Sequence, residues 1–193
     1  MGISDQDWLR TNEKAEAFES LKLANELMDK VDDDPYYWKW IILAVHGALQ
    51  ATMVLAVTGS TQYGALSEES QEAITAGKQA IRHMADFPEL YRRVKRKKAM
   101  TLFVTSKPLA GSPETDRAVR YLHRHLRNKF IHFLPTGWSI WIGDLPSVLD
   151  RCVSVISFLA FESGNIFWIE NPARDELAAL IDGLRSRLQA HQS

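Results

Sequence analysis

The segment from Arg127 to His132 combines three side chains that could act together on a phosphate group. Arg127, Asn128 and His132 provide a permanent cation, an amide and a titratable imidazole, all within about one and a half helical turns. An arginine can bond two phosphate oxygens at once, and a histidine can accept or donate a proton near neutral pH. RNA carries its own nucleophile, the 2′-hydroxyl, so cleavage without a metal needs mainly phosphate binding and proton transfer. We therefore take these three residues as candidate catalytic groups.

The helix expected to carry this segment has one apolar face and one basic face. Ser112-Pro113-Glu114 is typical of a helix start, and Pro135 should end the helix. At about 100° per residue, an apolar stripe about 80° wide forms on one side, made of Val119, Leu122, Leu126, Phe130 and Phe133. An arc of roughly 140° on the other side gathers Arg117, Arg120, Arg124, Arg127, Asn128 and His132. We expect Arg120 and Arg124 to bind substrate.

A second basic segment lies earlier in the chain, where residues 92–98 hold six basic residues in seven positions. Such a run can follow a phosphate backbone. The candidate substrate contacts in it are Arg92, Arg93, Lys95 and Arg96. The alternative is a solvated helix end, where basic residues suit the helix dipole.

Structural explanations also exist for the individual residues. A basic face is commonly just a solvated surface. His132 could favour the C-terminal end of its helix as an imidazolium, and Arg127 could form a structural ion pair. His123 and His125 are expected on the surface rather than in the chemistry. His46, on an apolar helix, needs a hydrogen-bond partner; His132 would make an acid–base pair with it only if the fold joined them.

The composition limits the classes of function. The 193 residues suit one domain, with 46% apolar and 24% charged residues. The formal net charge of -1 means that nucleic-acid binding would require a local patch. Cys152 is the only cysteine, so no intramolecular disulfide forms and we expect a cytoplasmic protein. The sequence shows no phosphate loop, zinc-spaced Cys/His set or serine nucleophile elbow, which predicts neither metal nor cofactor.

The elements predict an all-α fold, an up-and-down bundle of about six or seven helices in a single domain, 1–193. The apolar run Ile41–Val57 is interrupted by polar residues and is shorter than a bilayer span, so we expect a buried core helix and no membrane partner. A short stretch at 138–142 is expected to be extended, without forming a sheet. The expected helices cover residues 4–30, 36–58, a weak pattern at 67–86, a short helix from Pro88, and then 113–135, 149–159 and 172–190. Asp144 and Pro146 are expected to open the helix at 149–159, and Gly164 to end it.

The motif segment resembles a known family. Leu126-Arg127-Asn128, followed after three residues by His132-Phe133, resembles the motif of the HEPN superfamily, in which an arginine, commonly followed by asparagine, precedes a histidine by a few residues. A long apolar helix, then the motif helix, then a closing helix is also similar to the family's order. The stretch from Phe133 through Pro135 to Trp138-Ser139 resembles an extension in one bacterial branch. The resemblance covers about 36–162, with helices 4–30 and 172–190 packing on that part.

The resemblance implies an all-helical bundle that dimerises with the two motifs facing each other. Many members are metal-independent endoribonucleases, frequently toxins or antiviral effectors, and others are non-catalytic binding modules. In this chain Arg127 would contact the scissile phosphate, His132 would act as general acid or base, and Asn128 would orient one of them or bind substrate. One histidine per chain cannot act as acid and base at once, which favours a homodimer. An antitoxin, if one exists, would be a separate chain.

Overall fold

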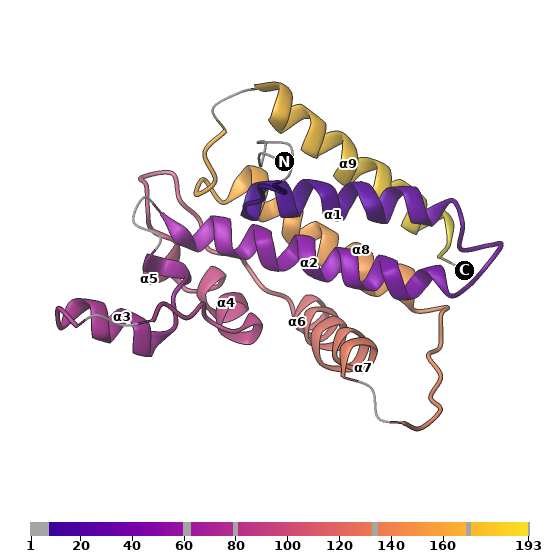
Figure 1. The fold of residues 1–193 in the computed structure, drawn as a ribbon. Coiled ribbons are helices and arrows are strands. Elements are labelled where there is room, and N and C mark those ends of the chain that lie inside the picture. Colours follow the sequence, from indigo (N-terminus) through magenta and orange to yellow (C-terminus); the bar gives the residue numbers. More distant parts are fainter. Residues whose placement is uncertain (1–7, 60–62, 79–80, 133–134, 169–170, 193) are drawn as a thin grey trace, which may run out of the picture.

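The computed structural model describes residues 8–59, 63–78, 81–132, 135–168 and 171–192. Within these ranges all regular structure is helical, and the only strand-like feature is one isolated antiparallel bridge between Leu66 and Met84. The all-α prediction is therefore confirmed for the described part of the chain. Four long helices form the main body (Figure 1): α1 (Glu13–Met28), α2 (Tyr37–Thr58), α8 (Leu145–Ser157) and α9 (Asn171–Ala190).

Helix α2 lies at the centre of the molecule because it is apolar on nearly every side. It packs against α1 and α8 in the main body, and on its other side against α4 and the helix that carries the motif. By length and composition α2 is the one helix of the described chain that could cross a bilayer, yet 72% of its most apolar window is buried inside the protein. Such burial is typical of a core helix.

Helix α1 begins later than the apolar pattern predicts. Residues 8–12 are not helical, and residues 1–7 lie outside the described ranges. The Oδ1 atom of Asn12 accepts a hydrogen bond from the Ala15 backbone N–H at 2.9 Å. This N-cap satisfies one of the free donors at the helix start and fixes the first helical residue at Glu13.

The weak pattern at 67–86 forms only one short helix, α3 (Glu68–Thr75). Ser67 caps it, and Gly77 follows with a φ of 69°, a left-handed conformation that ends a helix at little cost for glycine. The chain then returns, Met84 pairs with Leu66, and Asp86 caps α4 (Phe87–Val94). The basic run is divided between the end of α4 and the single turn α5 (Lys97–Met100).

The motif helix is continuous but not uniform. It consists of α6 (Pro113–Tyr121), a π-helical turn η3 (Leu122–Arg127) and the short α7 (Asn128–Ile131). Ser112 caps its start as predicted, accepting from the Thr115 N–H at 3.1 Å. The helix ends before Pro135, and Phe133, predicted in its apolar stripe, lies outside the described residues.

Helix α8 starts at Leu145 after the N-cap Asp144, where Asp144 and Pro146 predict the opening of a helix, and continues as the π-helical segment η4 (Phe158–Glu162) up to Gly164, whose φ is 71°. Between α7 and α8 the described residues 135–142 form neither helix nor strand. This segment extends away from the main body (Figure 1).

Candidate nucleic-acid interface

The structure places the three candidate catalytic residues at the end of the motif helix but does not join Arg127 to His132. Arg127 closes the π-helical turn, is half-buried, and its Nη1 donates to the Oδ1 of Asn128 at 3.0 Å. His132 follows α7 with an exposed side chain, while its backbone N–H donates to the Asn128 carbonyl at 2.8 Å. Among the described residues, no hydrogen bond or ring contact links Arg127 to His132.

The π-helical turn changes the layout expected for an ideal helix. The Asn128 backbone N–H donates to the carbonyl of His123, five residues back, instead of to that of Arg124. A wider turn rotates every later residue relative to the ones before it, so the single angular scale used for residues 113–135 does not hold across Leu122–Arg127. π-Helical turns are rare and are frequently found at functional sites.

The residue that meets a second histidine is His123, not His132. His46 on α2 lies with its Nε2 atom 3.0 Å from the Nδ1 atom of His123. Phe87 at the start of α4 stacks on both imidazoles, with ring centroids 4.4 Å from His46 and 4.5 Å from His123. His123 is thus half-buried in a three-ring stack. The prediction that it is an ordinary surface residue is therefore wrong.

Burial keeps both imidazoles neutral near neutral pH. Burial, together with smaller contributions from the nearby His123 and Arg127, lowers the pKa of His46 to about 3. The pKa of His123 is lowered by burial and by Arg127 and Arg124, while Asp86 opposes the shift. A neutral pair shares one N–H across the 3.0 Å contact, so either ring can be the donor. In both cases the Nε2 atom of His123 is the ring nitrogen not used in the pair.

The two predicted basic segments meet around one cavity. A cavity of about 480 Å³ lies between α4 and the motif helix. Five of the six predicted substrate contacts line it: Arg92, Lys95 and Arg96 from the first basic segment, with Arg120 and Arg124 from the second. The remaining lining residues are Phe87, Pro88, Tyr91, Asp116, Val119 and His123. Sequence patterns identified the cations, but only the fold brings them together.

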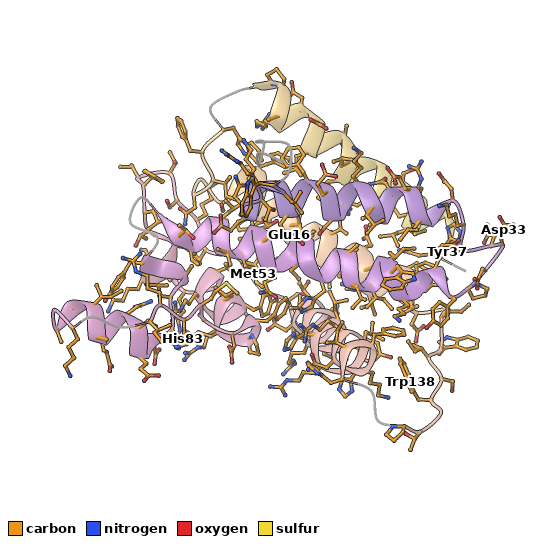
Figure 2. The ribbon with its side chains drawn as sticks, viewed as in Figure 1. Glu16, Asp33, Tyr37, Met53, His83 and Trp138 are labelled. Atoms are coloured by element: carbon orange, nitrogen blue, oxygen red, sulfur yellow. The ribbon has the colours of Figure 1, made fainter. Side chains whose placement is uncertain are left out.

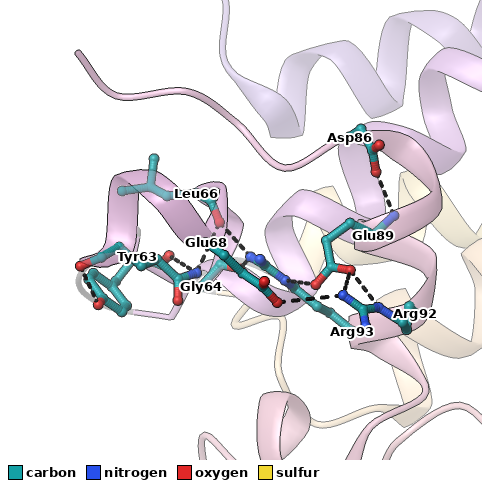
Figure 3. A network of polar contacts seen from close by, with 9 residues as sticks. Tyr63, Gly64, Leu66, Glu68, Asp86, Glu89, Arg92 and Arg93 are labelled. Carbon is teal, nitrogen blue, oxygen red and sulfur yellow. Dashed lines mark hydrogen bonds and ion pairs between the residues drawn. The ribbon is translucent and has the colours of Figure 1, made fainter. Parts of the chain in front are cut away.

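Arg93 has a structural role instead of the predicted substrate contact. Its side chain is only 8% exposed. Its Nε donates to Glu89 at 2.7 Å, and its Nη1 donates to the carbonyls of Gly64 and Leu66 at 2.7 and 2.6 Å (Figure 3). The guanidinium connects α4 to the segment before α3, and Arg93 is not among the residues that line the cavity.

Several cations of this surface lack an acidic partner. Arg92 is paired with Glu89 and Glu68, and Lys95 with Asp116, whose Oδ1 also accepts from the Tyr91 hydroxyl at 2.8 Å. In the described part of the chain, no ion pair holds Arg96, Arg120, Arg124 or Arg127. The alternative that Arg127 is neutralised by an acid is therefore not supported. Arg120 donates through Nε to the Asp116 carbonyl at 3.2 Å and Arg127 through Nη1 to Asn128, and the other N–H groups of the four guanidinium groups are available to an anion.

A second cavity, of about 500 Å³, lies beside the motif. Lys129 and Phe130 of α7 form one wall, and Trp138 lies 4.8 Å from Phe130 between ring centroids. Figure 2 shows Trp138 on the segment that extends beyond the motif helix. Ile131 and Trp141 nearby are 46% and 74% exposed. The neighbourhood of the motif thus has an exposed apolar surface.

His123 could have been found in the sequence by one signal. His46 is a polar residue on an otherwise apolar helix and needs a buried partner. His123 directly follows Leu122, one of the predicted core positions of the motif helix. The cavity itself leaves no such signal, because its two walls are distant in sequence.

In the described ranges no three His, Cys, Asp or Glu residues are grouped as metal ligands. No model of a known family, no curated protein and no solved structure matches this chain.

Proposed function

We propose that this protein is a metal-independent endoribonuclease of the HEPN type, which cleaves RNA at a site shared by two copies of the chain. The proposal depends above all on one observation: the guanidinium groups of Arg120, Arg124 and Arg127 lack ion pairs within the described chain, and they lead along one helix to the exposed His132. Unpaired like charges close together along one helix repel each other, which favours an anionic ligand. The all-helical architecture around α2 supports a HEPN-like bundle.

In the proposed reaction the 2′-oxygen of the RNA attacks the adjacent phosphorus while a histidine removes the 2′-hydroxyl proton. The bond from phosphorus to the 5′-oxygen breaks, and a second histidine donates a proton to that oxygen. Arg127 stabilises the charge that accumulates on the phosphate oxygens, and Asn128, bonded to it at 3.0 Å, orients the guanidinium.

Two chains supply what one chain lacks. The motif provides one histidine per chain, whereas the reaction uses an acid and a base, so a two-fold axis through the site would bring in both His132 side chains. The exposed Ile131, Trp138 and Trp141 around the motif are suitable for the contact between copies.

The direct test is cleavage of a labelled RNA by the purified protein in excess EDTA. We expect His132→Ala and Arg127→Ala each to lower the rate by about 100-fold or more, because each removes a group that acts in the transition state. His125→Ala is the matched control, since His125 is another exposed histidine of the same helix, and its rate should equal that of the wild type. Full activity of His132→Ala would contradict the proposal.

A non-catalytic binding module is the second candidate. It is favoured by the basic cavity, whose lining includes neither Arg127 nor His132. In that case RNA is bound but remains intact in the same assay, and Arg124→Ala weakens binding at least as much as His132→Ala does.

A further inference from the structure

We propose that the cavity between α4 and the motif helix binds one nucleotide of the RNA strand, with the base against the rings of Tyr91 and His123 and the phosphate on Arg96, Arg120 and Arg124. This inference rests on the proposed function in so far as RNA is the source of the nucleotide. The argument comes from three properties of the cavity: its floor, its rim and one positioned ring nitrogen.

The floor is apolar and aromatic. Phe87, Tyr91 and Val119 are 5%, 7% and 1% exposed, so their side chains are held in place, and the half-buried His123 is the more exposed ring of this floor. The Phe87 and His123 rings are parallel within 1°, and His46 supports both from α2. A rigid aromatic wall suits a planar base, because stacking needs a flat partner but no particular sequence.

The rim is cationic. Three exposed arginines of the rim have no ion pair in the described chain: Arg96, Arg120 and Arg124. Arg96 follows α4 and the other two lie on the motif helix, so the cations come from both walls of the cavity. The only carboxylate of the lining, Asp116, is held by Lys95 at 2.6 and 2.7 Å and by the Tyr91 hydroxyl. Its charge is thereby balanced within the wall, and the rim keeps its attraction for a phosphate.

His123 adds a directional contact. Its Nδ1 is occupied by His46, which leaves Nε2 for a hydrogen bond to the base in the cavity it lines. The volume of about 480 Å³ lies in the range of small-ligand pockets. An aromatic floor under a cationic rim is the combination that a nucleotide requires, whereas inorganic phosphate would use the rim alone.

The test is binding, measured separately from cleavage. A fluorescent 2′-O-methyl oligoribonucleotide of five residues lacks the nucleophile and cannot be cut by the proposed reaction. Its anisotropy is titrated at one fixed salt concentration, with adenosine monophosphate and inorganic phosphate as competitors. We expect Arg96→Ala and Arg120→Ala to weaken binding about tenfold each. Arg117→Ala should leave it unchanged, because Arg117 is paired with Glu114 and lies outside the cavity lining.

His123→Asn probes the directional contact, since the asparagine amide can replace Nδ1 toward His46 but offers nothing in place of Nε2. It should weaken the oligonucleotide and the monophosphate, and leave competition by inorganic phosphate unchanged. Stronger competition by the monophosphate than by inorganic phosphate supports a nucleotide site. If the monophosphate equals the oligonucleotide in affinity, free nucleotides are the ligand, and RNA as the source is wrong.

The inference is overturned if Arg96→Ala and Arg120→Ala bind as the wild type does, or if inorganic phosphate competes as well as the monophosphate. These outcomes are distinct from failure of the proposed function. If the protein binds RNA through the cavity but does not cut it, the nucleotide site is supported and the proposed enzyme activity is wrong. If the protein cuts RNA and Arg96→Ala leaves the KM unchanged, the enzyme activity is supported and the nucleotide site is wrong.

Discussion

At the scale of single residues, burial decides what each histidine can do. His46 is 4% exposed and makes its ring contact with His123, whereas His132 is exposed at the end of α7. A buried imidazole resists protonation because the charged form loses its hydration. The His46–His123 pair is therefore suited to support a surface in neutral form, whereas His132 is the histidine whose side chain is open to solvent.

The buried pair makes stability depend on pH. With a folded pKa of about 3 against an unfolded value of 6.5, His46 stays neutral in the folded protein while the unfolded chain takes up a proton below pH 6.5. Its contribution is complete above pH 6.5 and is lost as the pH falls toward 3. Between pH 7.5 and 5 we expect the unfolding free energy to drop by about 2 kcal/mol from this group, with His123 adding to the loss. Urea unfolding at each pH measures it.

His46→Gln is the matched variant, because its amide can still meet Nδ1 of His123 but does not titrate. Its unfolding free energy should fall less over the same interval. An equal fall in both proteins would show that His46 does not carry the effect. The interval stays above the range in which the carboxylates Glu89 and Asp116, both with lowered pKa, begin to titrate.

At the scale of elements, neighbouring arginines on α4 have different roles because the helix turns one toward the protein and the other toward solvent. Arg93 joins α4 to the segment Gly64–Leu66, while the Arg92 side chain is 48% exposed (Figure 3). The connection also orients the end of α4 and hence the cavity wall that Lys95 and Arg96 provide. A basic run is thus divided into a structural part and a part open to ligands.

Arg93→Ala should lower the unfolding free energy by about 2–3 kcal/mol, because it removes the three hydrogen bonds of a buried guanidinium, to Glu89 and to the half-buried carbonyls of Gly64 and Leu66. Arg92→Ala removes an exposed ion pair and should cost less than about 1 kcal/mol. Chemical denaturation of the two variants at neutral pH gives the comparison. Equal losses would mean that the buried hydrogen bonds of Arg93 contribute no more than a surface contact.

At the scale of the whole molecule, the proposed enzyme is complete only as a dimer whose two motifs share one site. An equal mixture of wild-type and His132→Ala chains, exchanged to equilibrium, then forms wild-type pairs in only about a quarter of the dimers. We expect the mixture to retain about a quarter of the RNA cleavage of the same total amount of wild-type chains. Sedimentation of each protein checks that the dimer forms. A retained half would mean that each chain acts alone.

Features set by short-range chemistry could be predicted from the sequence. Ser112 caps α6 because a hydroxyl accepts from an N–H three residues on, and α2 is recognised by its unbroken apolar composition. The apolar pattern predicts too early a start for α1, because it extends before the Asn12 cap. Gly77 ends the helix predicted at 67–86 after Thr75, because its left-handed conformation stops the helix. No residue pattern in the motif helix predicts its π-helical turn.

The sequence by itself determined that the chain is helical, that one helix carries both an apolar pattern and a series of arginines, and that Arg127, Asn128 and His132 follow one another near the end of that helix. These follow from periodicity and spacing along one segment. Only the tertiary structure decided that His46 meets His123, 77 residues away in the chain. It also decided that Arg93 is buried while Arg96, Arg120 and Arg124 surround one cavity. The physical reason is that partners across a core are chosen by how whole helices pack, which no local pattern records.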